Sequence, residues 1–249
     1  MKNLDFSSQE RSAILWLAAT FTILLIFWEL FREEITTAII IQHAVFFFAT
    51  MLVAIFLHEI GHKIAAEYVG YTAEAKRFTG GLIASTIIAF YTFARIPIIT
   101  PNLLELDADP RRRLDKRRMY DNPSQQAIIA GAGILGSIVA ITLMRVLAEL
   151  TGYTLFSTAQ FGVSLHAVFS LVPFELLAFF KLRVTKDIGQ LAPSDGLHIF
   201  RYSQFAWIFA FVFAIVFSII SFIQGVPTLL FSLAIATIGV LVYKNLVKK

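Results

Sequence analysis

The chain has 249 residues, of which 57% are hydrophobic and 15% are charged, and its mean hydropathy is +0.74. A soluble domain has about 45–50% apolar and about 25% charged residues, so this composition indicates a membrane protein, and the net charge of +4 is better explained by cytoplasmic loops than by nucleic-acid binding. Because there is no cysteine, disulfides, thiol nucleophiles and thiolate metal sites are excluded.

Apolar segments cover most of the chain, and each is about long enough to cross a hydrocarbon core of about 30 Å as a helix. The segment over 79–100 differs from the others, because it opens with two glycines and contains Arg95 and Pro97 near its end. Such a segment suits a re-entrant element buried against protein better than a helix facing lipid. The seven segments are Ser12–Trp28, Ile35–Leu57, Thr79–Thr100, Gln125–Met144, Phe161–Leu177, Ser203–Ile223 and Gly225–Val242.

The basic residues favour one topology, since cytoplasmic loops of membrane proteins are enriched in Lys and Arg. If 79–100 enters and leaves on one face, with the N-terminus in the cytoplasm, all of the 21 Lys and Arg residues are cytoplasmic except Arg32, Arg95 and Arg145. A seven-span arrangement, the alternative, leaves more basic residues outside in either orientation. We therefore predict an all-α polytopic membrane protein with six transmembrane helices, a re-entrant segment near 79–100 and both termini in the cytoplasm.

A short motif on the second apolar segment predicts a metal site. His58 and His62 are four residues apart on an expected helix that runs from Ile35 to about Tyr68, so both imidazoles lie on one face and can bind one zinc ion. Glu59 follows the first histidine, where it can reach a water on the metal and act as a general base. Ionisable side chains at the end of an uncharged apolar run are costly without partners, which favours a functional role.

A catalytic zinc site needs a third protein ligand and an open position. His43 is about 22 Å from His58 along the same helix and is therefore too far away. The remaining candidates are His166, His198 and the carboxylates. Asp195 is the most suggestive carboxylate, because it precedes a glycine and lies just before the sixth apolar segment, on the same predicted side as the histidines.

These residues resemble the site-2 proteases, a family of intramembrane zinc metalloproteases. The first matching element is the His-Glu-x-x-His segment at 58–62, and the second, Ala-Gly-Ile-Leu-Gly-Ser at 132–137, is similar to the family's Ala-Gly-Pro-x-x-Asn. The third is Ser-Leu-Val-Pro at 170–173 with Asp-Gly at 195–196, which looks like the family's Asn-x-x-Pro and Asp-Gly. The resemblance covers about residues 36–210 of a single expected domain, 1–249.

The resemblance implies that His58, His62 and Asp195 hold one zinc ion inside the lipid bilayer near the cytoplasmic face of the cell membrane. Glu59 would be the catalytic residue, and the substrate would be a transmembrane segment of another protein, cleaved by peptide hydrolysis. The resemblance also supports the re-entrant interpretation of 79–100.

The chain departs from the family pattern at several positions. Ile134 stands where the family has Pro, and Ser137 and Ser170 stand where it has Asn. The interval between the third element's proline and Asp195 is also longer than in the family, which leaves Glu175 and Asp187 as alternative ligands. A second hypothesis is a non-catalytic membrane metal-binding protein or an ion transporter, because intramembrane His, Glu and Asp also mark ion pathways.

Overall fold

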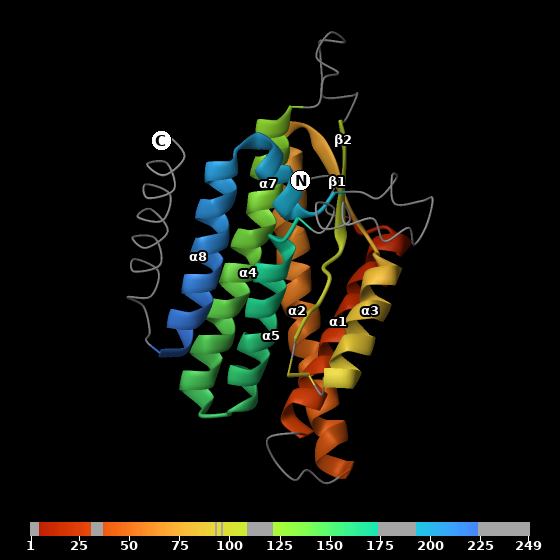
Figure 1. Ribbon diagram of the computed structural model, residues 1–249, viewed down its shortest axis with the longest axis vertical. Coiled ribbons are helices and arrows are strands. Elements are labelled where there is room, and N and C mark those ends of the chain that lie inside the picture. Colours follow the sequence, from red (N-terminus) through yellow and green to blue (C-terminus); the bar gives the residue numbers. More distant parts are fainter. Residues whose placement is uncertain are drawn as a thin grey trace.

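The computed structural model describes residues 5–30, 37–92, 94–95, 97–108, 122–173 and 193–223. The described part is mostly helical, with most helices aligned along the long axis and one two-stranded sheet near one end (Figure 1). The elements are α1 Ser8–Leu30, α2 Thr37–Val69, β1 Tyr71–Lys76, α3 Thr79–Thr92, β2 Leu103–Ala108, α4 Pro123–Thr151, α5 Leu155–Ser170, α7 Asp195–Tyr202 and α8 Gln204–Ile223.

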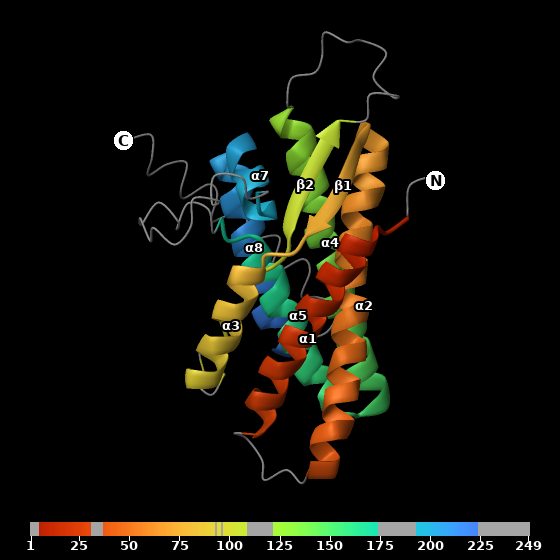
Figure 2. The ribbon, with the colours of Figure 1, turned by 90° about the vertical axis from the view of Figure 1, so that its right-hand side faces the viewer.

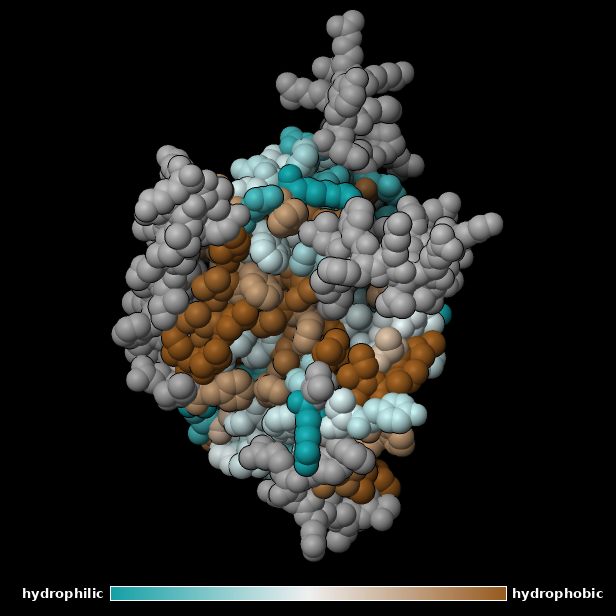
Figure 3. All heavy atoms as spheres, in the orientation of Figure 1, coloured by the Kyte–Doolittle hydropathy of each residue, from teal (hydrophilic) through white to brown (hydrophobic). Residues whose placement is uncertain are grey.

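Within the described residues, four helices, α1, α2, α4 and α8, are long and apolar enough to cross a membrane. Hydrophobic side chains gather at mid-height on the face shown in Figure 3, whereas hydrophilic ones gather near the end that carries the sheet. The sequence-based prediction of a helical membrane protein is therefore confirmed at this level.

The predicted count of six spanning helices is not reproduced. The fifth predicted span corresponds to α5, which has 16 residues and ends at Ser170, short of the roughly 20 that a span requires. Pro173 explains this end, because proline disfavours helical backbone at the residue before it and cannot donate to a helical hydrogen bond. The last predicted span, 225–242, lies outside the described residues.

The sheet was not predicted. β1 and β2 pair antiparallel, from Tyr71 opposite Ala108 to Lys76 opposite Leu103. Ala, Glu, Lys and Leu have little preference for strands, so only the alternating burial of β1, with Tyr71, Ala73 and Ala75 inside, hints at this structure.

The segment between the two strands leaves the sheet and returns to it (Figure 2). It descends as the 14-residue α3 and comes back as an extended chain that packs on that helix. The Thr100 backbone N–H donates to Ser85 Oγ at 3.0 Å, and Gly81 has no room for a Cβ beside Thr100. Both ends of this segment therefore lie at the same end of the sheet.

The closest helix packing joins α2 and α4, which run side by side through the centre of the bundle (Figure 1). A Cβ on Gly61 of α2 would overlap the backbone of Ala132, and a Cβ on Gly136 of α4 would overlap the backbone carbonyl of Leu57. Each helix therefore places a glycine against the backbone of the other, the usual way for membrane helices to approach closely.

A buried ion pair ties the start of α1 to α2. Glu10 Oε1 lies 2.8 Å from Lys63 Nζ, with both side chains less than a tenth exposed. Glu10 also accepts a hydrogen bond from the Ser7 backbone N–H at 2.7 Å, and Ser7 Oγ accepts one from the Glu10 N–H, which forms a capping box. One carboxylate thus starts α1 and holds it against the residue that follows His62.

We expect Gly136→Ala to destabilise the fold, because the added methyl must separate two backbones rather than displace a flexible side chain. Overpacking of this kind costs about 1–3 kcal/mol, which corresponds to a fall in Tm of roughly 2–12 °C for a chain of this size. Thermal unfolding in detergent micelles measures it. Gly131→Ala on the same helix is the control, since a Cβ there meets nothing within 4 Å, and its Tm should stay level or rise.

Lys63→Met should lower the free energy of unfolding by about 3–5 kcal/mol, because it leaves the Glu10 carboxylate buried without its partner. Lys76→Met is the matched control: Lys76 pairs with Glu74 and Glu105, but all three are about a third to a half exposed, so about 1 kcal/mol or less is expected. Denaturant unfolding compares the two variants. Equal losses would contradict a structural role for the buried pair.

Candidate metal centre

The two motif histidines lie on α2 near its sheet end, facing α4. His58 and His62 are 3% and 2% exposed, and their rings are one helical turn apart with centroids separated by 4.6 Å. A Cβ on Gly133 of α4 would overlap the His62 ring. Gly133 and Gly136 therefore let α4 pass close to α2 and leave space for the His62 ring.

Asp195 reaches the same point from the first turn of α7. Ser194 caps this helix through its side chain, which accepts a hydrogen bond from the Leu197 backbone N–H. Gly196 packs on the Leu171 carbonyl at the end of α5, where a Cβ would overlap it. The same carbonyl accepts a 2.7 Å hydrogen bond from Trp207 Nε1 on α8. These contacts tie α7 to α5 and α8 and fix the position of the carboxylate.

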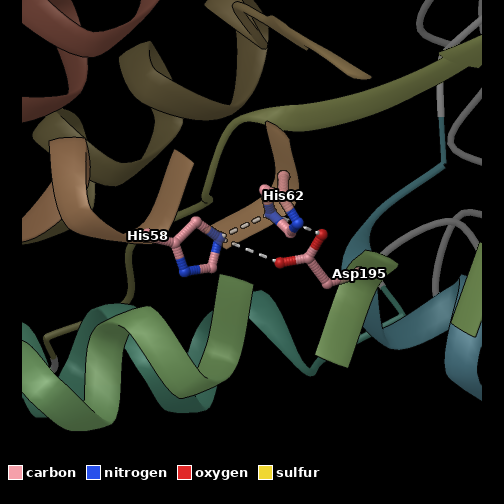
Figure 4. Close-up of side chains that lie close together, drawn as sticks. All are labelled: His58, His62 and Asp195. Carbon is pink, nitrogen blue, oxygen red and sulfur yellow. Dashed lines mark hydrogen bonds and ion pairs between the residues drawn. The ribbon is translucent and has the colours of Figure 1, made fainter. Parts of the chain in front are cut away.

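The ligand atoms of His58, His62 and Asp195 converge, as Figure 4 shows. His58 Nε2 lies 3.0 Å from Asp195 Oδ2, His62 Nε2 lies 3.3 Å from Asp195 Oδ1, and the two Nε2 atoms are 3.0 Å apart. Bonds of about 2.0–2.1 Å to a tetrahedral metal separate neighbouring ligand atoms by about 3.3 Å. The observed separations are close to that value, so the three side chains could hold one metal ion.

The other ring nitrogens are held by neighbours on α4. His58 Nδ1 lies 2.9 Å from Ser137 Oγ, and His62 Nδ1 lies 2.9 Å from the Ile129 carbonyl oxygen. A carbonyl can only accept, so His62 Nδ1 carries a proton, and Nε2 is the ring atom left to bind a metal. Partners of this kind orient metal-binding histidines in proteins.

The charge balance of the centre favours a cation. Burial alone would raise the pKa of the Asp195 carboxyl, but the facing His62 and His58 rings more than offset burial and hold that pKa below its ordinary value. Asp195 is therefore ionised at neutral pH. The carboxylate and the two rings attract one another inside a buried site, and a metal cation held by them would take the place of ring protons. The residues fit a metal ion.

Glu59 lies beside the three ligands without being one of them. Its side chain is 5% exposed, and it lines a cavity of about 10 Å³ together with the three ligands, His166 and residues 101–104. A volume of that order accommodates about one water molecule. Asn102 Nδ2 donates to Glu59 Oε1 at 3.4 Å. Asn102 was not predicted, since only the returning chain after α3 brings it here.

The remaining candidate ligands lie elsewhere. His43 is on the other half of α2, as its spacing predicts. His198 Nε2 lies 3.3 Å from the Leu104 carbonyl oxygen, and its Nδ1 lies 3.3 Å from the Gln126 side-chain amide. Burial lowers the pKa of His198, so its neutral ring acts as a link between α7, β2 and α4. Glu175 and Asp187 lie outside the described residues.

His166 and Ser170, both considered from the sequence, lie near the centre. His166 on α5 packs its ring edge-on against His58, with centroids 4.6 Å apart, and lines the cavity. Ser170 donates its hydroxyl to the His166 carbonyl at 2.9 Å, a hydrogen bond within α5 that uses its one proton.

Comparison with known proteins adds no family to this picture. A scan of protein families, a search of curated proteins and a search of solved structures each found no match.

We expect Asp195→Ala to abolish metal binding at the low metal concentrations that the wild type retains after dialysis, because only two of the three candidate ligands remain. Ser137→Ala should weaken binding by about 10–100-fold, since it removes the partner that orients His58. Metal content per chain and calorimetric titration measure both effects. Glu105→Ala on β2 is the control, since it also removes a carboxylate, but one that is about half exposed and pairs with Lys76. Full metal in Asp195→Ala would show that another residue is the third ligand.

Proposed function

We propose that this chain is an intramembrane zinc metalloendopeptidase, similar to the site-2 proteases, that hydrolyses peptide bonds in or near transmembrane segments of other proteins. The observation that carries the proposal is the convergence of His58, His62 and Asp195 on one point, with Glu59 beside them in the same cavity. His58, Glu59 and His62 lie on α2, which is long and apolar enough to cross a membrane, and Asp195 lies on the neighbouring α7.

The types of candidate ligand support zinc as the metal. Their number supports a catalytic rather than a structural site. Two imidazoles and one carboxylate are ligands that zinc prefers, and three protein ligands leave one position open. When bound, zinc supplies a Lewis acid that polarises the scissile carbonyl and makes a coordinated water acidic enough to attack it near neutral pH.

Glu59 is the general base of the proposed reaction. Its carboxylate accepts a proton from the attacking water and then delivers that proton to the amine that leaves, so the proton count of the enzyme is restored. The Asn102 side chain donates to one Glu59 oxygen and orients the carboxylate, which leaves the other oxygen for the proton.

The substrate class follows from the surroundings of the centre. A peptide bond in a transmembrane helix has its carbonyl already hydrogen-bonded, so the substrate segment must unwind locally before it can react. Water must also reach the centre, which favours a position near a membrane surface. The centre lies toward the sheet end of the bundle, where the hydrophilic side chains gather (Figure 3).

The distribution of basic residues supports the orientation. Arg11, Lys63, Lys76, Arg77 and Arg201 lie on elements that meet at the sheet end of the molecule. We propose that this end faces the cytoplasm. The segment over 79–100, which starts and ends at the sheet, would then be the re-entrant element.

We expect Glu59→Gln to lower kcat for cleavage of a membrane substrate by about 10²–10⁴-fold, with zinc retained, because Glu59 is not one of the three ligands. The assay uses zinc-loaded protein in proteoliposomes with a single-span substrate, and mass spectrometry identifies the products. Glu67→Gln, two turns further along α2, removes the same charge and should cleave at the wild-type rate.

Wild-type cleavage by zinc-loaded Glu59→Gln would refute the assignment of the base. Zinc uptake into proteoliposomes without any cleavage would instead support the transporter hypothesis.

A further inference from the structure

His166 has no part in the reaction described so far, yet it belongs to the same cavity. Its side chain is 2% exposed, and its ring lies edge-on to His58 with an interplanar angle of 77°. Phe21 of α1 packs on it from another direction, with ring centroids 5.7 Å apart. The ring is therefore held in one orientation beside Glu59 and the metal ligands.

Ser137 connects His166 to a metal ligand. Its Oγ lies 2.9 Å from His58 Nδ1 and 3.4 Å from His166 Nδ1, the second at the long end of the hydrogen-bond range. This hydroxyl carries one proton and can both donate and accept.

The direction of these hydrogen bonds follows from metal binding. When His58 Nε2 binds the metal, the neutral ring carries its proton on Nδ1, which donates to Ser137 Oγ. The serine proton is then free for His166 Nδ1, which accepts it. A neutral His166 ring whose Nδ1 accepts must carry its own proton on Nε2. The metal ligand thus sets the tautomer of His166 through one hydroxyl.

We propose that His166 is an additional catalytic residue, whose Nε2–H donates a hydrogen bond to the scissile carbonyl oxygen as negative charge develops on it. This inference rests on the proposed peptidase function. A fixed N–H donor in a buried site stabilises the transition state far more than the same donor would in water. The reason is that the donor is already oriented and does not have to move during the reaction. Neutral imidazole is suited to this role, since it donates without placing a second positive charge beside the metal.

The other polar side chains of the cavity are already committed. His58, His62 and Asp195 are the candidate ligands, Glu59 is the base, and Asn102 donates to Glu59. His166 is the histidine of the cavity lining that is not a candidate ligand, and the proposed reaction has so far given its N–H no role. It therefore provides the missing donor for the substrate oxygen.

The kinetic test compares His166→Leu, which removes the donor, with His166→Gln, whose amide can place an N–H near the position of Nε2. With zinc-loaded protein and a single-span substrate, His166→Leu should lower kcat by about 10²–10³-fold, with KM within about twofold. His166→Gln should recover at least tenfold of that loss. His43→Leu on the distant half of α2 controls for the loss of a partly buried histidine and should cleave like the wild type.

Zinc content separates a catalytic role from a structural one. Each His166 variant should hold one zinc per chain, as the wild type does. Loss of zinc in His166→Leu and His166→Gln would overturn the proposal and make His166 a residue that positions the ligands. Wild-type kcat in zinc-loaded His166→Leu would also overturn it while leaving the peptidase function intact.

A second measurement does not depend on activity. Nitrogen-15 NMR of histidine-labelled, zinc-loaded protein in micelles should show His166 as the Nε2–H tautomer, assigned by the signals missing in His166→Gln. In Ser137→Ala, saturated with zinc, this tautomer should lose its dominance. A dominant Nδ1–H form in the wild type would overturn the proposal. If the wild type shows the expected tautomer but cleaves no substrate, the proposed function fails and the catalytic role fails with it.

Discussion

The close approach of α2 and α4 is the constraint on which the rest of the structure depends. Glycines on both helices remove the side chains that would hold the backbones apart, so Gly61 faces the backbone of Ala132 and Gly136 faces that of Leu57. Inside a membrane such packing is driven by van der Waals contact and by polar pairs, because lipid provides no hydrophobic force between helices. The same approach places Ile129 and Ser137 of α4 against the rings of His62 and His58.

The candidate metal centre is buried, and its three candidate ligands are held by specific neighbours. The two imidazoles are oriented from α4, and the carboxylate is brought by the capped start of α7, itself packed on the end of α5. The Glu10–Lys63 pair fixes the start of α1 next to this part of α2. Helices α1, α4, α5 and α7 thus support the centre around α2. Its geometry is therefore determined by helix packing rather than by a single flexible loop.

Much of the helical architecture could be predicted from the sequence, because apolar length and charge are local properties. The predicted helix from Ile35 to about Tyr68 is found as α2, Thr37–Val69, and its histidine spacing gives the pair of ligands directly. The sheet could not be predicted, since the Glu, Ala and Lys residues of β1 form a strand only because β2 pairs with them. The predicted span over 161–177 was wrong in both bounds. The helix found there, α5, begins at Leu155 and ends at Ser170, before Pro173.

The sequence by itself therefore determined a helical membrane protein from its apolar segments, and two histidines and a glutamate as candidate site residues from their spacing along one helix. It could suggest Asp195 only from the predicted topology and a family resemblance, because no local pattern connects residues more than 130 positions apart. Tertiary structure alone brought that carboxylate within 3.0 Å of His58, placed Asn102 on Glu59 and linked His166 to His58 through Ser137. These contacts depend on how the helices pack and on the path of the chain between α3 and β2. The fold as a whole sets the distances between these residues.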